Sequence, residues 1–240
     1  MGVNLITAGD ELLLGRRQFG FFDDFFQFTT GDRWTSIEAD SGASTSKQNE
    51  PGGEIDLITG ATDNNEVYIH TTNEIFKLAD GKTLMCEARI QYAEAATSAA
   101  NIIFGFLSGG FAANHLADTG GGPPGTYDGA CFFKVDGGTN WQVESSDNTS
   151  QTTTELTALN SEDSVAKTAG GSSYQTLAIE ITPTSSTRMD VAFFIDGKLV
   201  KKHNETYETP AVMDLGIGVK AGSGTSETLT VDYIAAYQLR

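Results

Sequence analysis

The stretch LMCEARIQY, residues Leu84–Tyr92, places an apolar side chain at every second position. Glu87, Arg89 and Gln91 occupy positions between them. Successive side chains of a β-strand point to opposite faces of its sheet, so this period of two predicts an antiparallel strand with one buried face.

The same alternation recurs later in the chain, at Leu177–Ile181, Val191–Ile195, Leu215–Val219 and Leu229–Tyr237. In the last of these segments, the pattern predicts that Tyr233, Ala235 and Tyr237 share one face with Leu229 and Val231. No long apolar stripe at the 3.6-residue spacing of a helix is present. We therefore expect an all-β fold, a two-sheet antiparallel β-sandwich, in which turn sequences such as Asp196-Gly197 join tight hairpins.

Two segments, Asn101–Leu107 and Cys131–Phe133, are apolar on both faces. This composition suits central strands covered on each side, and it equally suits strands at a protein interface. The polar stretch Thr149–Ser173 is expected to be a surface loop, long enough to hold a short hairpin or a helical turn near Leu156–Leu159.

Composition excludes several classes of partner. The 240 residues carry a net charge of -17, which repels phosphate backbones, so nucleic acid is not an expected partner. No apolar run approaches the roughly 18 residues of a membrane span, and no basic segment followed by a long apolar stretch marks a signal peptide. We expect no membrane association and synthesis in a cytoplasm.

The N-terminal segment, residues 1–20, shows no strand alternation and is expected to be an extended arm ahead of a single domain, 21–240. A solvated tail is the simpler interpretation. The alternative is an arm that docks on another subunit through an apolar run and a basic pair. The candidate interface residues are Leu12, Leu13, Leu14, Arg16 and Arg17.

The residues that commonly bind metals are scattered. His70, His115 and His203 are isolated in sequence, and Cys86 and Cys131 are expected to be buried free thiols. Loop oxygens near Asp63 to Glu66 leave calcium possible, but no complete calcium-loop motif is present, so no cofactor is expected.

Three segments resemble the concanavalin A-like lectin/glucanase superfamily, whose fold is a jelly roll of two curved antiparallel sheets. Gly81–Ile90 is similar to the G-x-x-E-A-R-I strand of laminarinase-like glycoside hydrolases. Phe193–Val200 is similar to their F-x-x-D-G-x-x-V hairpin, and Leu229–Gln238 to their closing strand, V-D-Y-V-R-V-Y-Q. The three occur in the family's order, and they imply a concanavalin A-like jelly roll with an N-terminal arm.

The catalytic motif of that family is missing. In the hydrolases, E-x-D-x-x-E follows the E-A-R-I strand and supplies a nucleophile and a general acid. The corresponding stretch, Tyr127–Val135, has no two carboxylates at i and i+2. Glu54 and Asp56 have that spacing but precede the E-A-R-I strand, and we interpret them as the polar face of a strand. No catalytic residue, and hence no enzyme, is expected.

The segment Phe22–Phe26, followed by Trp34, resembles the start of tailed-phage structural proteins of this superfamily. The resemblance implies a virion structural protein assembled in the host cytoplasm, most simply a capsid decoration (cement) protein. Its partner would be a capsid or other virion protein, and a homo-oligomer is expected.

The alternative function is a lectin-like carbohydrate-binding module, for example on a tail fibre, with Trp141 and Tyr127 as aromatic platforms for sugars. Trp141 equally suits a core position. A glycoside hydrolase with relocated carboxylates is the third hypothesis.

Overall fold

The computed structural model describes residues 18–207 and 211–240. The candidate interface residues Leu12, Leu13, Leu14, Arg16 and Arg17 lie outside the described residues. The end of the predicted arm, Gln18 to Gly20, belongs to the first strand.

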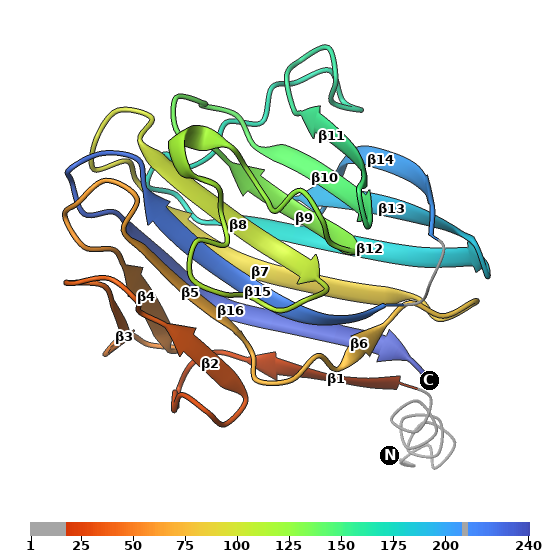
Figure 1. Cartoon of the computed structure of the whole chain (residues 1–240), viewed down its shortest axis with the longest axis horizontal. Coiled ribbons are helices and arrows are strands. Elements are labelled where there is room, and N and C mark those ends of the chain that lie inside the picture. Colours follow the sequence, from red (N-terminus) through yellow and green to blue (C-terminus); the bar gives the residue numbers. More distant parts are fainter. Residues whose placement is uncertain (1–17, 208–210) are drawn as a thin grey trace, which may run out of the picture.

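The described chain folds into two antiparallel sheets stacked one behind the other (Figure 1). Sheet A has the order β14-β13-β12-β7-β16-β4-β3, and β1 also pairs with β16. Its strands are β1 (Gln18–Asp23), β3 (Ser44–Gln48), β4 (Glu54–Ile58), β7 (Leu84–Tyr92), β12 (Gln175–Ser185), β13 (Arg188–Ile195), β14 (Lys198–Thr206) and β16 (Thr228–Leu239).

Sheet B has the order β11-β10-β9-β8-β15-β5-β2, and β6 pairs with β15. Its strands are β2 (Trp34–Ile37), β5 (Glu66–Thr71), β6 (Phe76–Lys77), β8 (Ala100–Leu107), β9 (Gly129–Lys134), β10 (Gln142–Asp147), β11 (Ser150–Glu155) and β15 (Val212–Ala221). One 3-10 turn, η1 (Asp118–Gly120), lies between β8 and β9. The two-sheet antiparallel sandwich predicted from the sequence is confirmed.

The stretch LMCEARIQY forms β7 with the predicted boundaries. Its side chains alternate between buried and half-buried, and the strand lies between β12 and β16. The apolar side chains of β7 and of the other sheet A strands pack against those of sheet B in one continuous core. Burying each large apolar side chain contributes about 1.5–3 kcal/mol, so this core is the main stabilising element.

The expected alternation of β16 is wrong beyond Val231. The register against β7 shifts between Val231 and Tyr233, where one residue, Asp232, bulges out of the ladder. A bulge reverses the faces of all the residues that follow it. Ile234 and Ala236 are therefore in the core, while Tyr237 is exposed.

The two strands that are apolar on both faces are covered by the chain itself. All eight residues of β8 and all six of β9 are buried. One face of each contributes to the core between the sheets. The other face packs under residues 108–128, the connection between β8 and β9, which we call the cover segment. The alternative interpretation, that these strands are bare for a subunit interface, is wrong.

The predicted turn at Asp196-Gly197 joins β13 to β14, and both residues have positive φ, 51° and 72°. Two successive residues with positive φ are typical of the tight turn that matches the twist of a hairpin.

The stretch 149–173 is not entirely a loop, because β11 pairs with β10. Cys86 and Cys131 are buried and free, as expected.

Candidate functional site

The strand to which the resemblance assigns the catalytic signature is β9, in sheet B. Its residues Cys131 and Phe133 point to the outer face of the sheet, and Phe132 points into the core between the sheets. No carboxylate is present on β9, and Lys134 at its end pairs with Glu94 at 2.8 Å. This strand therefore supplies neither a nucleophile nor a general acid.

The cover segment covers the outer face of sheet B over β5, β8, β9 and β15 with apolar side chains. Phe111, Leu116 and Tyr127 from this segment pack on Tyr68, Ile103, Leu107, Cys131 and Phe133 of the sheet. Phe111, the most exposed of these residues, is only 6% accessible. The chain's own residues therefore occupy the outer face of sheet B above β9, the face to which Cys131 and Phe133 point.

A buried ionic group fixes the middle of the cover segment to sheet B. The Lys220 Nζ donates a hydrogen bond of 2.8 Å to the Leu116 carbonyl oxygen and contacts the Asp118 carboxylate. It also lies 3.7 Å from the Glu66 carboxylate, which accepts a hydrogen bond of 2.7 Å from the Tyr68 hydroxyl. Because Lys220 is fully buried, its charge is tolerated only with these partners.

An aromatic stack fixes the beginning of the segment. The Phe111 ring lies between two imidazoles, with ring centroids 5.8 Å from His70 and 4.2 Å from His115. His70 Nδ1 lies 2.8 Å from the Asp214 carboxylate. Burial, and secondly the nearby His70, lower the pKa of His115 to about 4, so this ring is neutral near pH 7.

The two aromatic residues proposed as sugar platforms are buried. Trp141 is fully buried, and its Nε1 donates a hydrogen bond of 3.1 Å to Gln175. Tyr127 is 2% exposed, and its hydroxyl donates a hydrogen bond of 2.9 Å to Glu144, whose pKa is raised by burial. Neither ring presents a face on which a sugar could stack. The alternative position for Trp141, the core, is the observed one.

The pair Glu54 and Asp56 lies on the outer face of sheet A, as expected for the polar face of β4. Both carboxylates are engaged, since Glu54 accepts a hydrogen bond from the Tyr174 hydroxyl and Asp56 accepts one of 2.6 Å from Thr230. The Arg89 guanidinium lies over the Tyr174 ring, 3.8 Å from its centroid. Burial and the neighbouring Glu54 raise the pKa of Tyr174 to about 12.

Phe22 to Phe26 form a corner that exposes two phenylalanines, and we call it the FDDFF corner. Asp23 organises it, because its carboxylate accepts hydrogen bonds of 3.0 Å from the Phe25 amide and 2.9 Å from the Trp34 indole. Phe25 is consequently turned into the core, with a positive φ of 55°. Phe22 and Phe26, on either side, are 60% and 72% exposed.

The exposed rings border a hollow of about 380 Å³ that also includes Asp24, Asp32 and Arg33. The Phe22 ring packs on Tyr233, with centroids 5.2 Å apart, so it is held in place although it is exposed. Exposed aromatic rings beside charged groups are typical of protein interaction surfaces. The sequence analysis used this segment only for its resemblance to phage proteins and did not predict it as an interaction surface, because nothing in the sequence shows which of its phenylalanines are exposed.

No protein-family model matches the chain, and no curated protein matches it significantly. Solved structures do match. The carbohydrate recognition domain of Emp47p is 14% identical, with a TM-score of 0.61 over 94% of this chain and 98% of that one. An endo-1,3-beta-glucanase from Streptomyces sioyaensis is 16% identical, with a TM-score of 0.58 over 92% and 96%. An endo-beta-1,4-glucuronan lyase from the fungus Trichoderma reesei is 10% identical, with a TM-score of 0.60 over 90% and 94%.

The chain has the concanavalin A-like jelly-roll fold. These neighbours include enzymes and a carbohydrate recognition domain, so catalytic and non-catalytic proteins share this jelly roll. In this jelly roll, the cover segment covers the outer face of sheet B over β5, β8, β9 and β15, and Phe22 and Phe26 of the FDDFF corner are exposed.

Within residues 18–207 and 211–240 of the jelly roll, no group of three or more His, Cys, Asp or Glu side chains is arranged to hold a metal ion. Glu66, in the loop region considered for calcium, is buried beside Tyr68 and Lys220. In the same described ranges, no helix is long and apolar enough to cross a membrane.

Proposed function

We propose that this jelly roll is a non-enzymatic virion structural protein that decorates an assembled capsid. The observation that carries the proposal is the filled outer face of sheet B. Because the cover segment occupies the outer face of sheet B over β5, β8, β9 and β15, the proposed binding surface lies elsewhere on the molecule.

The absence of carboxylates on β9 supports the non-enzymatic part of the proposal. A glycosidase of this fold needs two carboxyl groups that flank a bound sugar. Glu144 is near β9, but Tyr127 and Thr153 engage it beneath the surface. Glu54 and Asp56 lie on the other sheet, where Tyr174 and Thr230 engage them.

The FDDFF corner supports the binding part of the proposal. Because Phe22 and Phe26 are 60% and 72% exposed, each would contribute roughly 1–2 kcal/mol if a partner buried the exposed part completely. Large aromatic anchors of this kind dominate the energy of many protein interfaces. Packing of the Phe22 ring on Tyr233 holds Phe22 in place, which reduces the entropy that binding would cost.

A decoration protein stabilises a shell by mass action. It binds the assembled lattice but not the separate subunits, and its binding energy therefore favours the assembled state. A standard interface of about 800 Å² on each partner is sufficient for such binding.

The test is a sedimentation assay in which the purified chain is mixed with capsids that lack it and, separately, with free capsid subunits. We expect saturable binding to capsids alone, and no release of reducing sugar from β-glucans. Equal binding to free subunits, or none to capsids, would contradict the decoration role. Hydrolysis of a glucan would contradict the non-enzymatic role.

Carbohydrate binding is the second candidate function, favoured by the likeness to a carbohydrate recognition domain. Because Trp141 and Tyr127 are buried, Tyr174 is the ring to test, since it lies with Arg89 and Glu54 on the outer face of sheet A. Binding to one class of sugar on a glycan array, lost in Tyr174→Ala and kept in Tyr237→Ala, would favour this function over decoration.

A further inference from the structure

The two edges of sheet B differ in how their backbone groups are occupied. At one edge, the turn before β2 closes the strand, because the Gly31 amide donates a hydrogen bond of 2.8 Å to the Trp34 carbonyl oxygen. The Ser36 amide donates a second one, of 3.1 Å, to the Thr30 hydroxyl. At the other edge, β11 pairs only with β10 and lies at the margin of the molecule (Figure 1). Within the part of the chain that the structure describes, β11 is therefore the open edge of this sheet.

The free backbone groups of β11 belong to Gln151 and Thr153. In an antiparallel ladder, every second residue exchanges its backbone hydrogen bonds with the neighbouring strand, and the residues between them direct theirs away. Just beyond β11, the Leu156 amide donates a bond of 2.9 Å to the Trp141 carbonyl oxygen, so the even-numbered residues of β11 face β10. Gln151 and Thr153 consequently direct their N–H and C=O groups outward, and no other described segment hydrogen-bonds to these groups.

β11 also lacks the features that usually protect an edge strand. Its sequence, SQTTTE, contains no lysine and no proline, and its register against β10 has no bulge. Five of its six residues are exposed. By contrast, β14, the edge strand of sheet A that contacts β10, carries three lysines, and its Val200 carbonyl oxygen accepts a hydrogen bond of 2.9 Å from the Glu162 amide. An edge strand without such protection is a template for a further strand.

We propose that β11 pairs in the antiparallel direction with β11 of a second copy of this chain, which joins the two copies of sheet B into one sheet. A two-fold axis at Thr152 places Gln151 of each copy opposite Thr153 of the other. Each of these pairs exchanges both of its backbone hydrogen bonds, so all the free groups of Gln151 and Thr153 are satisfied together.

The side chains of β11 are compatible with this symmetric pairing. Ser150 lies opposite Thr154, and Glu155 opposite Thr149, so no two like charges meet, and pairs of Thr and Ser favour the contact. A second copy also brings an equally open edge, so one contact closes both. Only one strand of each copy takes part, and each copy has a net charge of -17, so the dimer is weak and is strengthened by salt.

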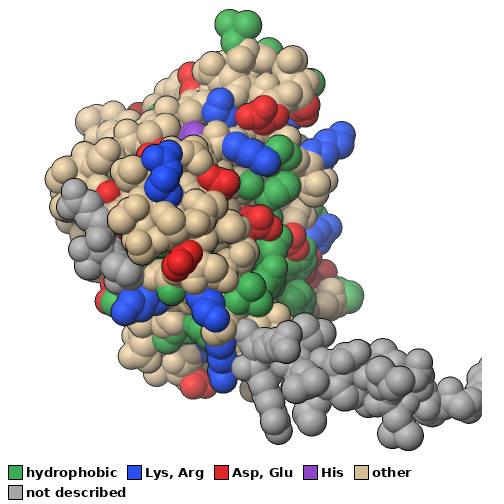
Figure 2. All heavy atoms as spheres, turned by 90° about the vertical axis from the view of Figure 1, so that its right-hand side faces the viewer, with side chains coloured by type: hydrophobic (Ala, Val, Ile, Leu, Met, Phe, Trp, Pro, Cys, Tyr) green, Lys and Arg blue, Asp and Glu red, His purple; other side chains and the backbone are tan. Residues whose placement is uncertain are grey.

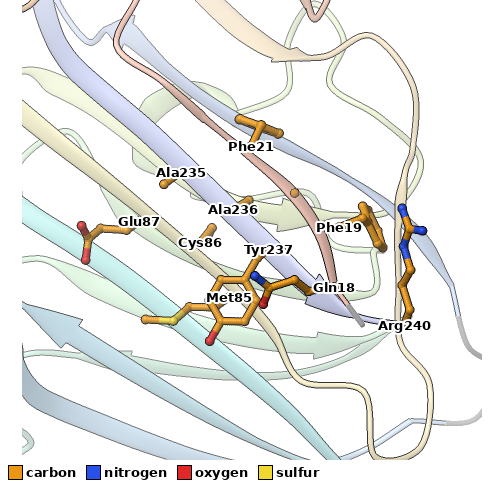
Figure 3. A pocket seen from close by; sticks show the side chains of 11 residues that line it. Gln18, Phe19, Phe21, Met85, Cys86, Glu87, Ala235, Ala236, Tyr237 and Arg240 are labelled. Carbon is orange, nitrogen blue, oxygen red and sulfur yellow. The ribbon is translucent and has the colours of Figure 1, made fainter. Parts of the chain in front are cut away.

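β11 is not part of the apolar surface of the molecule, because it has no hydrophobic side chain. Hydrophobic side chains gather instead in a band along one side, with charged side chains interspersed (Figure 2). A groove of about 640 Å³ across β1, β7 and β16 (Figure 3) has a mixed lining that includes Tyr237, Glu87 and Arg240. This groove adjoins the FDDFF corner, since Ala235 in its lining pairs with Phe22. The pairing of β11 uses backbone hydrogen bonds and neither of these surfaces.

The FDDFF corner lies beside β2, at the edge of sheet B opposite to β11, since the Trp34 indole at the start of β2 donates a hydrogen bond to Asp23 of the corner. A dimer through β11 therefore presents two corners. Because dimerisation is measured without capsids, its failure leaves the decoration role intact, and failure of capsid binding leaves the dimer intact.

Disulfide trapping of Thr152→Cys tests the register. The two Thr152 positions form a non-hydrogen-bonded pair with Cα atoms about 4.5 Å apart, within the range that a disulfide spans. Ser150→Cys is the matched control, because Ser150 is exposed on the same face of β11 but lies about 14 Å from its copy along the strands. The native Cys86 and Cys131 are buried.

Under mild oxidation, we expect a disulfide-linked dimer from Thr152→Cys and about tenfold less or even lower yields from Ser150→Cys, because only the first pair is held in contact. Equal yields from the two variants, or no linked dimer from Thr152→Cys, would overturn the proposal.

Analytical ultracentrifugation of the full chain gives a second readout. Gln151→Pro removes an outward N–H that bonds nothing within the chain, and proline is tolerated at such positions of edge strands. Gln151→Ala removes the same side chain but keeps the N–H, so it is the matched control. The thermal unfolding of both variants shows whether each is folded.

In about 0.3 M salt, which screens the net charge, we expect the unmodified chain and Gln151→Ala to dimerise. Gln151→Pro should dimerise about tenfold or more weakly, because each copy loses a backbone hydrogen bond. A monomeric unmodified chain at about 1 mM, or equal dimerisation of the two variants, would overturn the proposal. A monomer whose capsid binding is lost in Gln151→Pro would likewise overturn it and assign the edge to a strand of the capsid.

Discussion

The Phe111 ring lies directly over Gly216 of β15: a Cβ on Gly216 would lie 2.3 Å from the ring. The missing side chain on the sheet makes room for the ring on the cover segment. The outer face of sheet B can therefore be closed by a connection between two adjacent strands.

Gly216→Ala will destabilise the protein, because either the ring or the strand must move to admit a methyl group. We expect a loss of about 1–3 kcal/mol in the free energy of unfolding, measured by urea denaturation. Gly125→Ala in the cover segment is the control, since nothing lies within 4 Å of a Cβ at that position. Equal losses for both variants would show that Phe111 does not depend on Gly216.

Lys220→Met will leave the Glu66 carboxylate buried without its cationic partner, because Lys220 and Glu66 are both almost completely buried. Breaking a buried ion pair in this way costs about 3–5 kcal/mol of stability. Adding Glu66→Gln removes the uncompensated charge and should recover part of the loss. If the loss in the free energy of unfolding of the double variant equals the sum of the losses of the two single variants, the two groups do not interact.

Stability will fall on acidification through the histidines. Burial, the largest cause for each, lowers the pKa of His115 and of His203 to about 4, below the ordinary value of 6.5. The unfolded chain therefore binds more protons than the native protein between about pH 6.5 and 4, and stability decreases as pH falls through this window. The raised pKa of Glu144 opposes this trend near its lower end.

The double variant His115→Gln, His203→Gln isolates this contribution. In urea titrations between pH 7 and 4, its stability should depend less on pH than that of the unmodified protein, by an amount that corresponds to up to about two protons. The same dependence in both proteins would mean that these histidines are protonated as readily in the folded chain as in the unfolded one.

Trp141→Ala will act on stability and not on sugar recognition. The ring is fully buried and meets Phe132 edge to face with centroids 6.3 Å apart. Truncating a buried tryptophan costs about 3–5 kcal/mol, which thermal or urea unfolding would measure. A stable variant that had lost binding to a sugar would contradict the core position.

The sequence predicted those parts of the fold that depend on local patterns. Leu84–Tyr92 alternates cleanly, so β7 could be predicted with its boundaries, and Asp196-Gly197 carries the residues that a tight hairpin requires. The bulge at Asp232 left no such mark, since Val231 and Tyr233 suit a regular strand equally well.

The content of the site was harder to predict because it depends on contacts between distant segments. The empty catalytic strand was visible at Tyr127–Val135. The cover was not, since Phe111 and Leu116 stand among polar and glycine-rich residues that suggest an ordinary loop. The buried Lys220, opposite Asp118 in space but far from it in sequence, gave no signal either.

In the proposed function, the jelly roll binds a capsid through the FDDFF corner. This role is tested by measuring the affinity for capsids of the double variant Phe22→Ser, Phe26→Ser. The control is Leu159→Ser, which removes an exposed apolar side chain elsewhere on the surface. We predict binding weaker by about tenfold or more for the double variant and unchanged for the control, at equal stability. Undiminished binding by the double variant would contradict a capsid-binding role of the FDDFF corner.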